Sequence, residues 1–272
     1  MIPILSRTTP YLYMPSLSGR DKITVMTTTR TPLPDLNHTT ILDLETFLIT
    51  DTDLAPQLVA VGLLTGTERA DLRVISGRAH EPRRHCAAYQ GKDVFEQDPA
   101  ENLLELLKHL FSDVNQYVIG HRICFDLGVI LRWFPALKET VFGAVHAGRV
   151  LDTRMTMAAI MNMAEDRVQA AGLHDDGETK ALHLSACIRR FAPALDTGGK
   201  SHAGSWSTRF ADLYYCPPWA WPVQAQQYLA HDLRGTQAVA VGQNAITGLV
   251  PVWIETLDRH LTEVAHRART LP

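Results

Sequence analysis

Two carboxylates interrupt an apolar run at residues 41–47, which read I-L-D-L-E-T-F. Side chains alternate between the faces of a strand, so Asp43 and Glu45 would share one face while the leucines beside them share the other. Their Cβ atoms would lie ~7 Å apart, and burying like charges that close is costly unless something compensates them. A divalent cation would compensate them; alternatively, the run is an edge strand whose polar face meets water.

The composition is that of an ordinary soluble globular chain with a sizeable core, 46% hydrophobic and 20% charged over 272 residues. A formal net charge of −3 gives no basic footprint for a large duplex-binding surface, although an acidic metal cluster can offset local basic patches. The four cysteines form no C-x-x-C pair, which fits reduced thiols in a cytoplasmic compartment better than a disulfide framework or a zinc site. No run approaches 18 apolar residues, so we expect no membrane span.

Residues 1–36 are rich in proline and threonine and lack a sustained periodicity, so we expect a loose leader there. The start of translation is open among Met1, Met14 and Met26. Residues 37–272 are expected to form a single domain.

Hydrophobic patterning in that domain predicts an α/β fold in which helices flank a mixed β-sheet. The predicted strands are residues 39–45, 57–64, 71–76 and 117–120. The predicted helices are residues 98–111, 125–134, 150–165, 181–191 and 222–241, followed by a closing helix over residues 250–265. Residues 196–221 are expected to form a long loop.

Three further aspartates stand at informative places. Asp126 follows a strand end and opens a helix, and Asp152 opens another; an acid there is also favoured by the helix dipole alone. Asp232 lies four residues after Tyr228, so the two side chains share a helix face. Four carboxylates on one face could hold two Mg²⁺ or Mn²⁺ ions, which clamp a phosphodiester, while a nearby tyrosine orients the attacking water. A phosphohydrolase built on the His-Asp pair at 231–232 would need further histidine ligands.

In their order along the chain, these segments resemble the three exonuclease motifs of the DEDD superfamily, tyrosine subtype. The segments are D-L-E at 43–45, G-H-x-x-x-F-D at 120–126 and Y-x-x-x-D at 228–232. The strongest similarity is to the 3′–5′ proofreading exonuclease domain of phage-type family A DNA polymerases, and it covers about residues 39–242. The resemblance implies a ribonuclease-H-like fold and metal-dependent release of 5′-mononucleotides from a 3′ end.

The resemblance also implies roles for individual residues. The metal ligands would be Asp43, Glu45, Asp126 and Asp232, with Tyr228 orienting the water. The substrate-binding residues would be Thr46, Phe47, Ile49, His121, Arg122 and Phe125, although His121 is also explained as a structural histidine. Arg122 departs from the pattern, because the family usually carries Asn there; an arginine could contact a phosphate instead.

The first hypothesis is a 3′–5′ exonuclease that acts on single-stranded or frayed DNA ends with two Mg²⁺ or Mn²⁺ ions. Only about 40 residues follow Asp232, too few for a polymerase, so a separate polymerase subunit is a possible partner. The alternatives are a 3′–5′ exoribonuclease of the same superfamily and a catalytically silent module that binds nucleic acid or a polymerase.

Overall fold

The computed structural model describes residues 31–50, 53–66, 69–74, 85–86, 94–97, 100–169, 182–195, 206–214, 216 and 220–269. Most of the predicted leader, residues 1–30, lies outside this part of the chain. The described end of the leader is docked: Thr31 and Leu249 exchange two backbone hydrogen bonds, at 3.0 and 2.8 Å. None of the helices in the described part is both long enough and apolar enough to cross a membrane.

Eight strands form one mixed sheet in the order β4-β5-β3-β2-β1-β6-β7-β8. Their bounds are β1 Thr39–Thr46, β2 Leu58–Thr65, β3 Arg69–Val74, β4 His85–Cys86, β5 Val94–Gln97, β6 Tyr117–Gly120, β7 Val150–Asp152 and β8 Val250–Pro251. β1 pairs antiparallel with β2 and parallel with β6, while β2–β3 is antiparallel and β6–β7 parallel. This central β3-β2-β1-β6-β7 arrangement is the ribonuclease-H-like α/β fold expected from the sequence.

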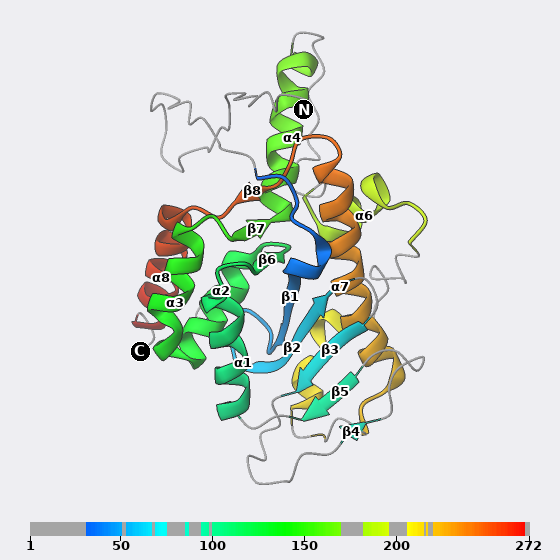
Figure 1. Cartoon of the computed structure of the whole chain (residues 1–272). Coiled ribbons are helices and arrows are strands. Elements are labelled where there is room, and N and C mark those ends of the chain that lie inside the picture. The colour runs from blue at the N-terminus through cyan, green and yellow to red at the C-terminus, as the bar shows by residue number, and fades with distance from the viewer. Residues whose placement is uncertain are drawn as a thin grey trace.

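Helices cover both faces of the sheet (Figure 1). On one face α1 (Ala100–Ser112), α2 (Ile123–Trp133), α3 (Lys138–His146) and α8 (Ile254–Arg269) bury a core that includes Leu42 and Leu44. On the other face α7 (Val223–Asn244) lies across β1, β2 and β3 and buries a second core that includes Ile41. α4 (Thr153–Gln169) and α6 (Leu184–Phe191) pack against α7. The alternation predicted for residues 41–47 is therefore confirmed.

At two places a short strand stands where the sequence analysis predicted the start of a helix. Residues 150–152, predicted as the start of a helix, form β7, and residues 250–251 form β8 before the last helix begins at Ile254. Both strands are so short that their side chains show no alternation, and their hydrogen bonds with neighbouring strands decide the conformation. The sequence analysis also missed α3, whose buried side chains are few: Val141, Ala144 and Val145.

Gly62 allows α7 to lie close to the sheet opposite the acidic strand. It pairs with Asp43 across the β1–β2 ladder. A Cβ atom at this position would lie 2.9 Å from Cδ1 of Leu233 and 3.1 Å from Cδ1 of Leu229, both on α7. Because Leu233 follows Asp232, the missing side chain of Gly62 helps to set the distance between the acids of β1 and that of α7.

Replacing Gly62 by Ala is expected to lower the free energy of unfolding by about 1–3 kcal/mol, because the buried leucines of α7 must move. Urea unfolding followed by circular dichroism measures the change. Gly143→Ala is the matched control: this glycine is exposed on α3 with nothing within 4 Å of an added Cβ, so we expect a gain of about 0.5–1 kcal/mol. Equal effects of the two substitutions would contradict the close approach.

Candidate metal centre

β1 presents Asp43 and Glu45 on the face covered by α7. The β1–β2 register shifts between Glu45 and Thr46, so the strand bulges immediately after the second acid. Glu45 is buried with 8% of its surface exposed, and Asp43 is half-buried. The strand therefore brings two carboxylates together where water cannot fully solvate them, and the predicted edge-strand alternative is excluded because β1 is central in the sheet.

Asp232 completes this group from α7. One ligand oxygen from each of Asp43, Glu45 and Asp232 lies within 4.8 Å of the other two. Asp232 is itself buried, with 7% of its surface exposed. Three carboxylates this close repel one another strongly, and they offer the oxygen donors that hard divalent cations such as Mg²⁺ and Mn²⁺ prefer. The donor set thus fits a divalent ion.

Asp126 adds a fourth carboxylate beside Asp43 but does not belong to the group of three. It lies in the first turn of α2 and is 4% exposed. Burial raises the pKa of the Asp126 carboxyl well above its usual range, and the charges of Asp43 and Asp152 raise it further. The backbone N–H of Leu44, between the two acids of β1, donates a hydrogen bond to it and partly offsets this effect. Asp126 therefore lies close enough to Asp43 for the two charges to interact, although it is outside the group of three.

Tyr228 lies one helical turn before Asp232 on α7 and is half-buried. Its ring centroid is 5.8 Å from that of Phe210, which is buried and also contacts Trp221 and Trp206 at 5.8 and 6.1 Å. This aromatic packing restricts the tyrosine ring while leaving it beside the acids. Phe210 begins a short 3-10 helix, Phe210–Leu213, which follows another at Trp206–Thr208 within the stretch predicted as a long loop. The sequence analysis did not identify Phe210, because helices this short show no periodic pattern.

Three predicted substrate contacts follow Glu45 directly. Phe47 packs edge-to-face on Tyr214 with ring centroids 5.4 Å apart, so this ring is already engaged by the protein. Ile49 is 46% exposed and is free of such packing. The hydroxyl of Thr46 donates to the carbonyl of Phe47 at 2.8 Å. The exposed apolar side chain of Ile49 is the one of the three most open to a base.

His121 and Phe125, both from the second motif, are held by contacts within the protein. Nε2 of His121 lies 3.0 Å from the carbonyl oxygen of Leu182, to which it must donate, and Nδ1 lies 2.9 Å from the hydroxyl of Thr153. Phe125 packs against the core under α1, α2 and α3. These contacts are those of a structural histidine and a core aromatic, and their contact with a substrate stays a prediction.

Asp152 is structural in its contacts, one of the two explanations that its sequence position allows. Its carboxylate accepts four backbone N–H groups, at 2.7–3.2 Å, from the first residues of two helices: Arg122, Ile123, Arg154 and Met155. Burial raises the pKa of the Asp152 carboxyl above its ordinary value, and these hydrogen bonds offset only part of the rise. Because its oxygens cap α2 and α4 together, Asp152 fixes the position of the α2 turn that carries Asp126.

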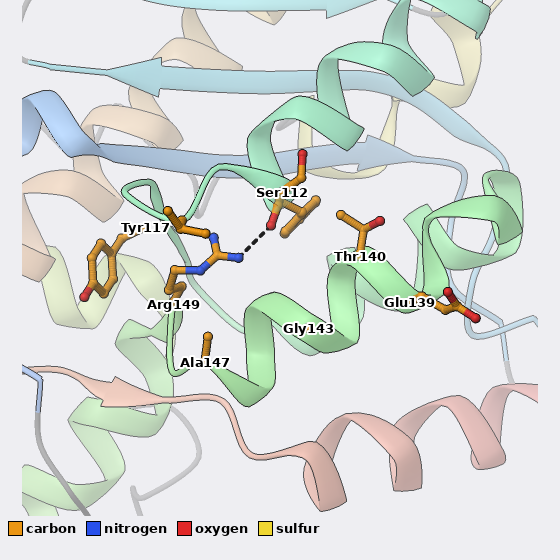
Figure 2. Close-up of a pocket in the computed structure, with 9 residues that line it drawn as sticks. Ser112, Tyr117, Glu139, Thr140, Gly143, Ala147 and Arg149 are labelled. Atoms are coloured by element: carbon orange, nitrogen blue, oxygen red, sulfur yellow. Dashed lines mark hydrogen bonds between the residues drawn. The ribbon is translucent and has the colours of Figure 1, made fainter.

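A pocket lies at the opposite end of the parallel strands from the carboxylates, near the first residues of β6 and β7. There the buried guanidinium of Arg149 donates to the backbone carbonyls of Phe111, Asp113 and Gln116 at 2.8–3.0 Å. Figure 2 shows this side chain pointing toward the end of α1, next to Ser112. Arg149 thereby satisfies carbonyls left open where α1 ends. The carboxylates lie instead near the carboxyl ends of β1 and β6, where ligands of open α/β sheets bind.

The sequence matches no protein-family model and no curated protein. Among solved structures, the chain is similar to NrnC of Brucella melitensis bound to pGG, with 15% identity and a TM-score of 0.42 over 86% of this chain and 84% of that one. It is also similar to Escherichia coli RNase D, described as an exoribonuclease involved in structured RNA processing, with 17% identity and a TM-score of 0.41 over 86% of this chain and 46% of that one. These similarities are too distant to assign the chain to a family.

Replacing Asp126 by Asn is expected to stabilise the metal-free protein and to weaken its stabilisation by Mn²⁺. Its raised pKa means that ionising the buried carboxyl lowers the free energy of unfolding. This cost is absent below the ordinary carboxyl pKa of about 4 and grows as the pH rises toward the folded-state pKa. Asn keeps the shape without the charge, so we expect a gain of about 1 kcal/mol or more at pH 7, measured by urea unfolding in EDTA.

The control for that experiment is Asp258→Asn on the exposed surface of α8, which should change the free energy of unfolding by less than about 0.5 kcal/mol. An Asp126→Asn protein that is less stable than the parent chain in EDTA would show that this carboxylate is not a destabilising charge.

Proposed function

We propose that this chain is a divalent-metal-dependent 3′–5′ exonuclease that releases 5′-mononucleotides from single-stranded ends. The observation that carries the proposal is the group of three carboxylates within 4.8 Å, with Asp126 beside Asp43 and Tyr228 one turn from Asp232. The direction of cleavage is supported by the resemblance of the three sequence motifs. An alternative phosphohydrolase built on His231 has no support in this group, which contains only acids.

In this proposal, Asp43, Glu45 and Asp232 hold one ion, and Asp43 with Asp126 holds a second. When bound, such ions stabilise the charge that develops on the attacking and leaving oxygens of a phosphodiester. Burying four acids in one place lowers the stability of the protein because the acids repel one another. A bound cation would relieve this repulsion.

Tyr228 has the role of orienting the attacking water. A phenol of pKa near 10 is a poor base at neutral pH, so its hydroxyl is expected to hold the water by a hydrogen bond. Attack of the water oxygen on phosphorus breaks the P–O3′ bond. The phosphate stays on the 5′ oxygen of the released nucleotide. The water loses a proton as it attacks, and the leaving O3′ takes one up, so the shortened chain ends in a new 3′ hydroxyl.

The sugar of the substrate separates two candidates. DNA, with a separate polymerase as partner, is supported by the motif resemblance to proofreading domains alone. RNA has the more direct counterpart in the solved structures reported above, one of which is described as an exoribonuclease. Hydrolysis of labelled DNA and RNA of one sequence, compared at equal enzyme concentration, separates the two, because an enzyme that is specific for one sugar distinguishes the 2′ hydroxyl.

The activity itself is tested with 5′-labelled single strands of DNA and RNA in Mn²⁺, in Mg²⁺ and in EDTA. A ladder that shortens from the 3′ end only with metal is expected. Asp43→Asn and Asp232→Asn should each lower the rate at least about a hundredfold, because each removes a ligand charge. If both nucleic acids stay intact with either metal, the proposed activity is wrong, and the silent binding module becomes the better hypothesis.

The tyrosine has its own test. Tyr228→Phe is expected to lower kcat about ten- to hundredfold while KM and the stabilisation by Mn²⁺ stay nearly constant, since the attacking water loses a hydrogen bond and the four carboxylates are unchanged. Tyr117→Phe is the matched control, because Tyr117 is also half-buried but begins β6 at the far end of the sheet. Equal kcat values for the Tyr228→Phe and parent proteins would remove the tyrosine from the mechanism.

A further inference from the structure

Two arginines that the proposed chemistry does not use are held side by side next to the acids. The backbone N–H groups of Arg122 and Arg154 donate to the same oxygen, Oδ1 of Asp152, at 3.2 and 2.7 Å. Arg122 precedes the first residue of α2, and Arg154 is the second residue of α4. One carboxylate thus brings two guanidinium-bearing residues from different parts of the chain to one edge of the sheet.

Neither guanidinium has a carboxylate partner within the described ranges of the chain. The arginines with ion pairs there include Arg132 and Arg209, which lie elsewhere in the sequence. Asp152 already accepts four backbone N–H groups, so its oxygens are committed to the helix ends. The two arginines therefore bring positive charge together without an ion pair to any residue that the structure describes.

The electrostatic environment is consistent with this crowding of cations. Burial lowers the pKa of Arg154, the positive charge of Arg122 lowers it further, and the negative charge of Asp152 offsets only part of this effect. The pKa of His260 is also lowered, first by burial and then by Arg122. An anion held between the two arginines would offset this repulsion.

Arg122 also has a strained backbone. Its φ of 68° lies in the left-handed region, and it is the one non-glycine residue with positive φ in the described part of the chain. A residue with a Cβ atom rarely adopts this conformation, and the common exceptions are Asn and Asp. Such strain persists where the surroundings fix it and is concentrated at functional sites.

The pair borders the proposed active site. Asp126 lies one helical turn beyond Arg122 on α2, and the charge of Asp152 reaches Asp126 strongly enough to raise its pKa, after burial and Asp43. A single strand with one phosphate at the carboxylates has its next phosphate only one nucleotide away, and the arginines beside Asp152 are the cations that border this position. Guanidinium groups bind phosphate oxygens in pairs, which suits them to this role.

We propose that Arg122 and Arg154 bind a non-scissile phosphate of the nucleic acid chain, adjacent to the one that is cleaved. The inference rests on the proposed exonuclease function and adds a substrate requirement to it. The preferred substrate carries at least two phosphates, and a mononucleotide ester with a single phosphate is cleaved much less efficiently.

The test compares a single-stranded oligonucleotide with the p-nitrophenyl ester of thymidine 5′-monophosphate, which has one phosphodiester. The variants are Arg122→Asn, chosen because Asn tolerates the left-handed conformation, and Arg154→Gln. The control is Arg189→Gln, at an exposed arginine of α6. We expect each test variant to lower kcat/KM for the oligonucleotide about tenfold more than for the ester, mainly through KM, and the control to change neither.

Binding gives an independent readout. Fluorescence anisotropy of a labelled oligonucleotide in EDTA, repeated over a range of salt concentrations, should show a slope of log K against log salt reduced by about 0.7 for each lost phosphate contact. Equal losses on both substrates, or unchanged binding slopes in both variants, would overturn the inference. A parent protein that cleaves neither substrate but loses affinity on Arg122→Asn would instead refute the proposed exonuclease and leave the phosphate site standing.

Discussion

Mutual repulsion among buried carboxylates is the constraint on which the rest of this structure depends. Asp43, Glu45 and Asp232 converge within 4.8 Å, and burial with neighbouring charge raises the pKa of Asp126. Nothing in the stability of the apo fold favours such a group, because each charge loses hydration and gains a like neighbour. The surrounding sheet and helices must hold these acids in place against that cost, which is the pattern of a site shaped for a cation rather than for stability.

The fold supplies that rigidity through its central strand. β1 lies between β2 and β6, with apolar cores on both faces, so its register is strongly specified. A slip by one residue would exchange Asp43 and Glu45 with the leucines beside them. α7 is held against the same strand pair at Gly62, and this contact sets the height of Asp232 above the sheet. The acids are thus fixed by hydrophobic packing that they do not take part in.

The parts that could be predicted from the sequence are those in which a local period determines the outcome. Strand alternation placed Asp43 and Glu45 on one face, and helical spacing paired Tyr228 with Asp232; both are found in the structure. β7 could not be predicted in this way, because three buried residues at the centre of a sheet carry no alternation. Phe210 was missed for a related reason: its importance lies in rings that meet across the fold.

Asp152 shows where local reasoning about acids reaches its limit. From the sequence alone, an aspartate that opens a predicted helix can bind a metal, although the helix dipole already favours an acid there for structural reasons. Burial raises the pKa of both Asp152 and Asp126, so the difference lies in their neighbours. Asp152 accepts four backbone N–H groups from two helix ends, whereas Asp126 faces the like charge of Asp43. By satisfying the ends of two helices at once, Asp152 also places Arg122 and Arg154 beside the acids. Asp152, whose own charge caps two helices, therefore determines where the positive charge of the two arginines lies relative to the carboxylates.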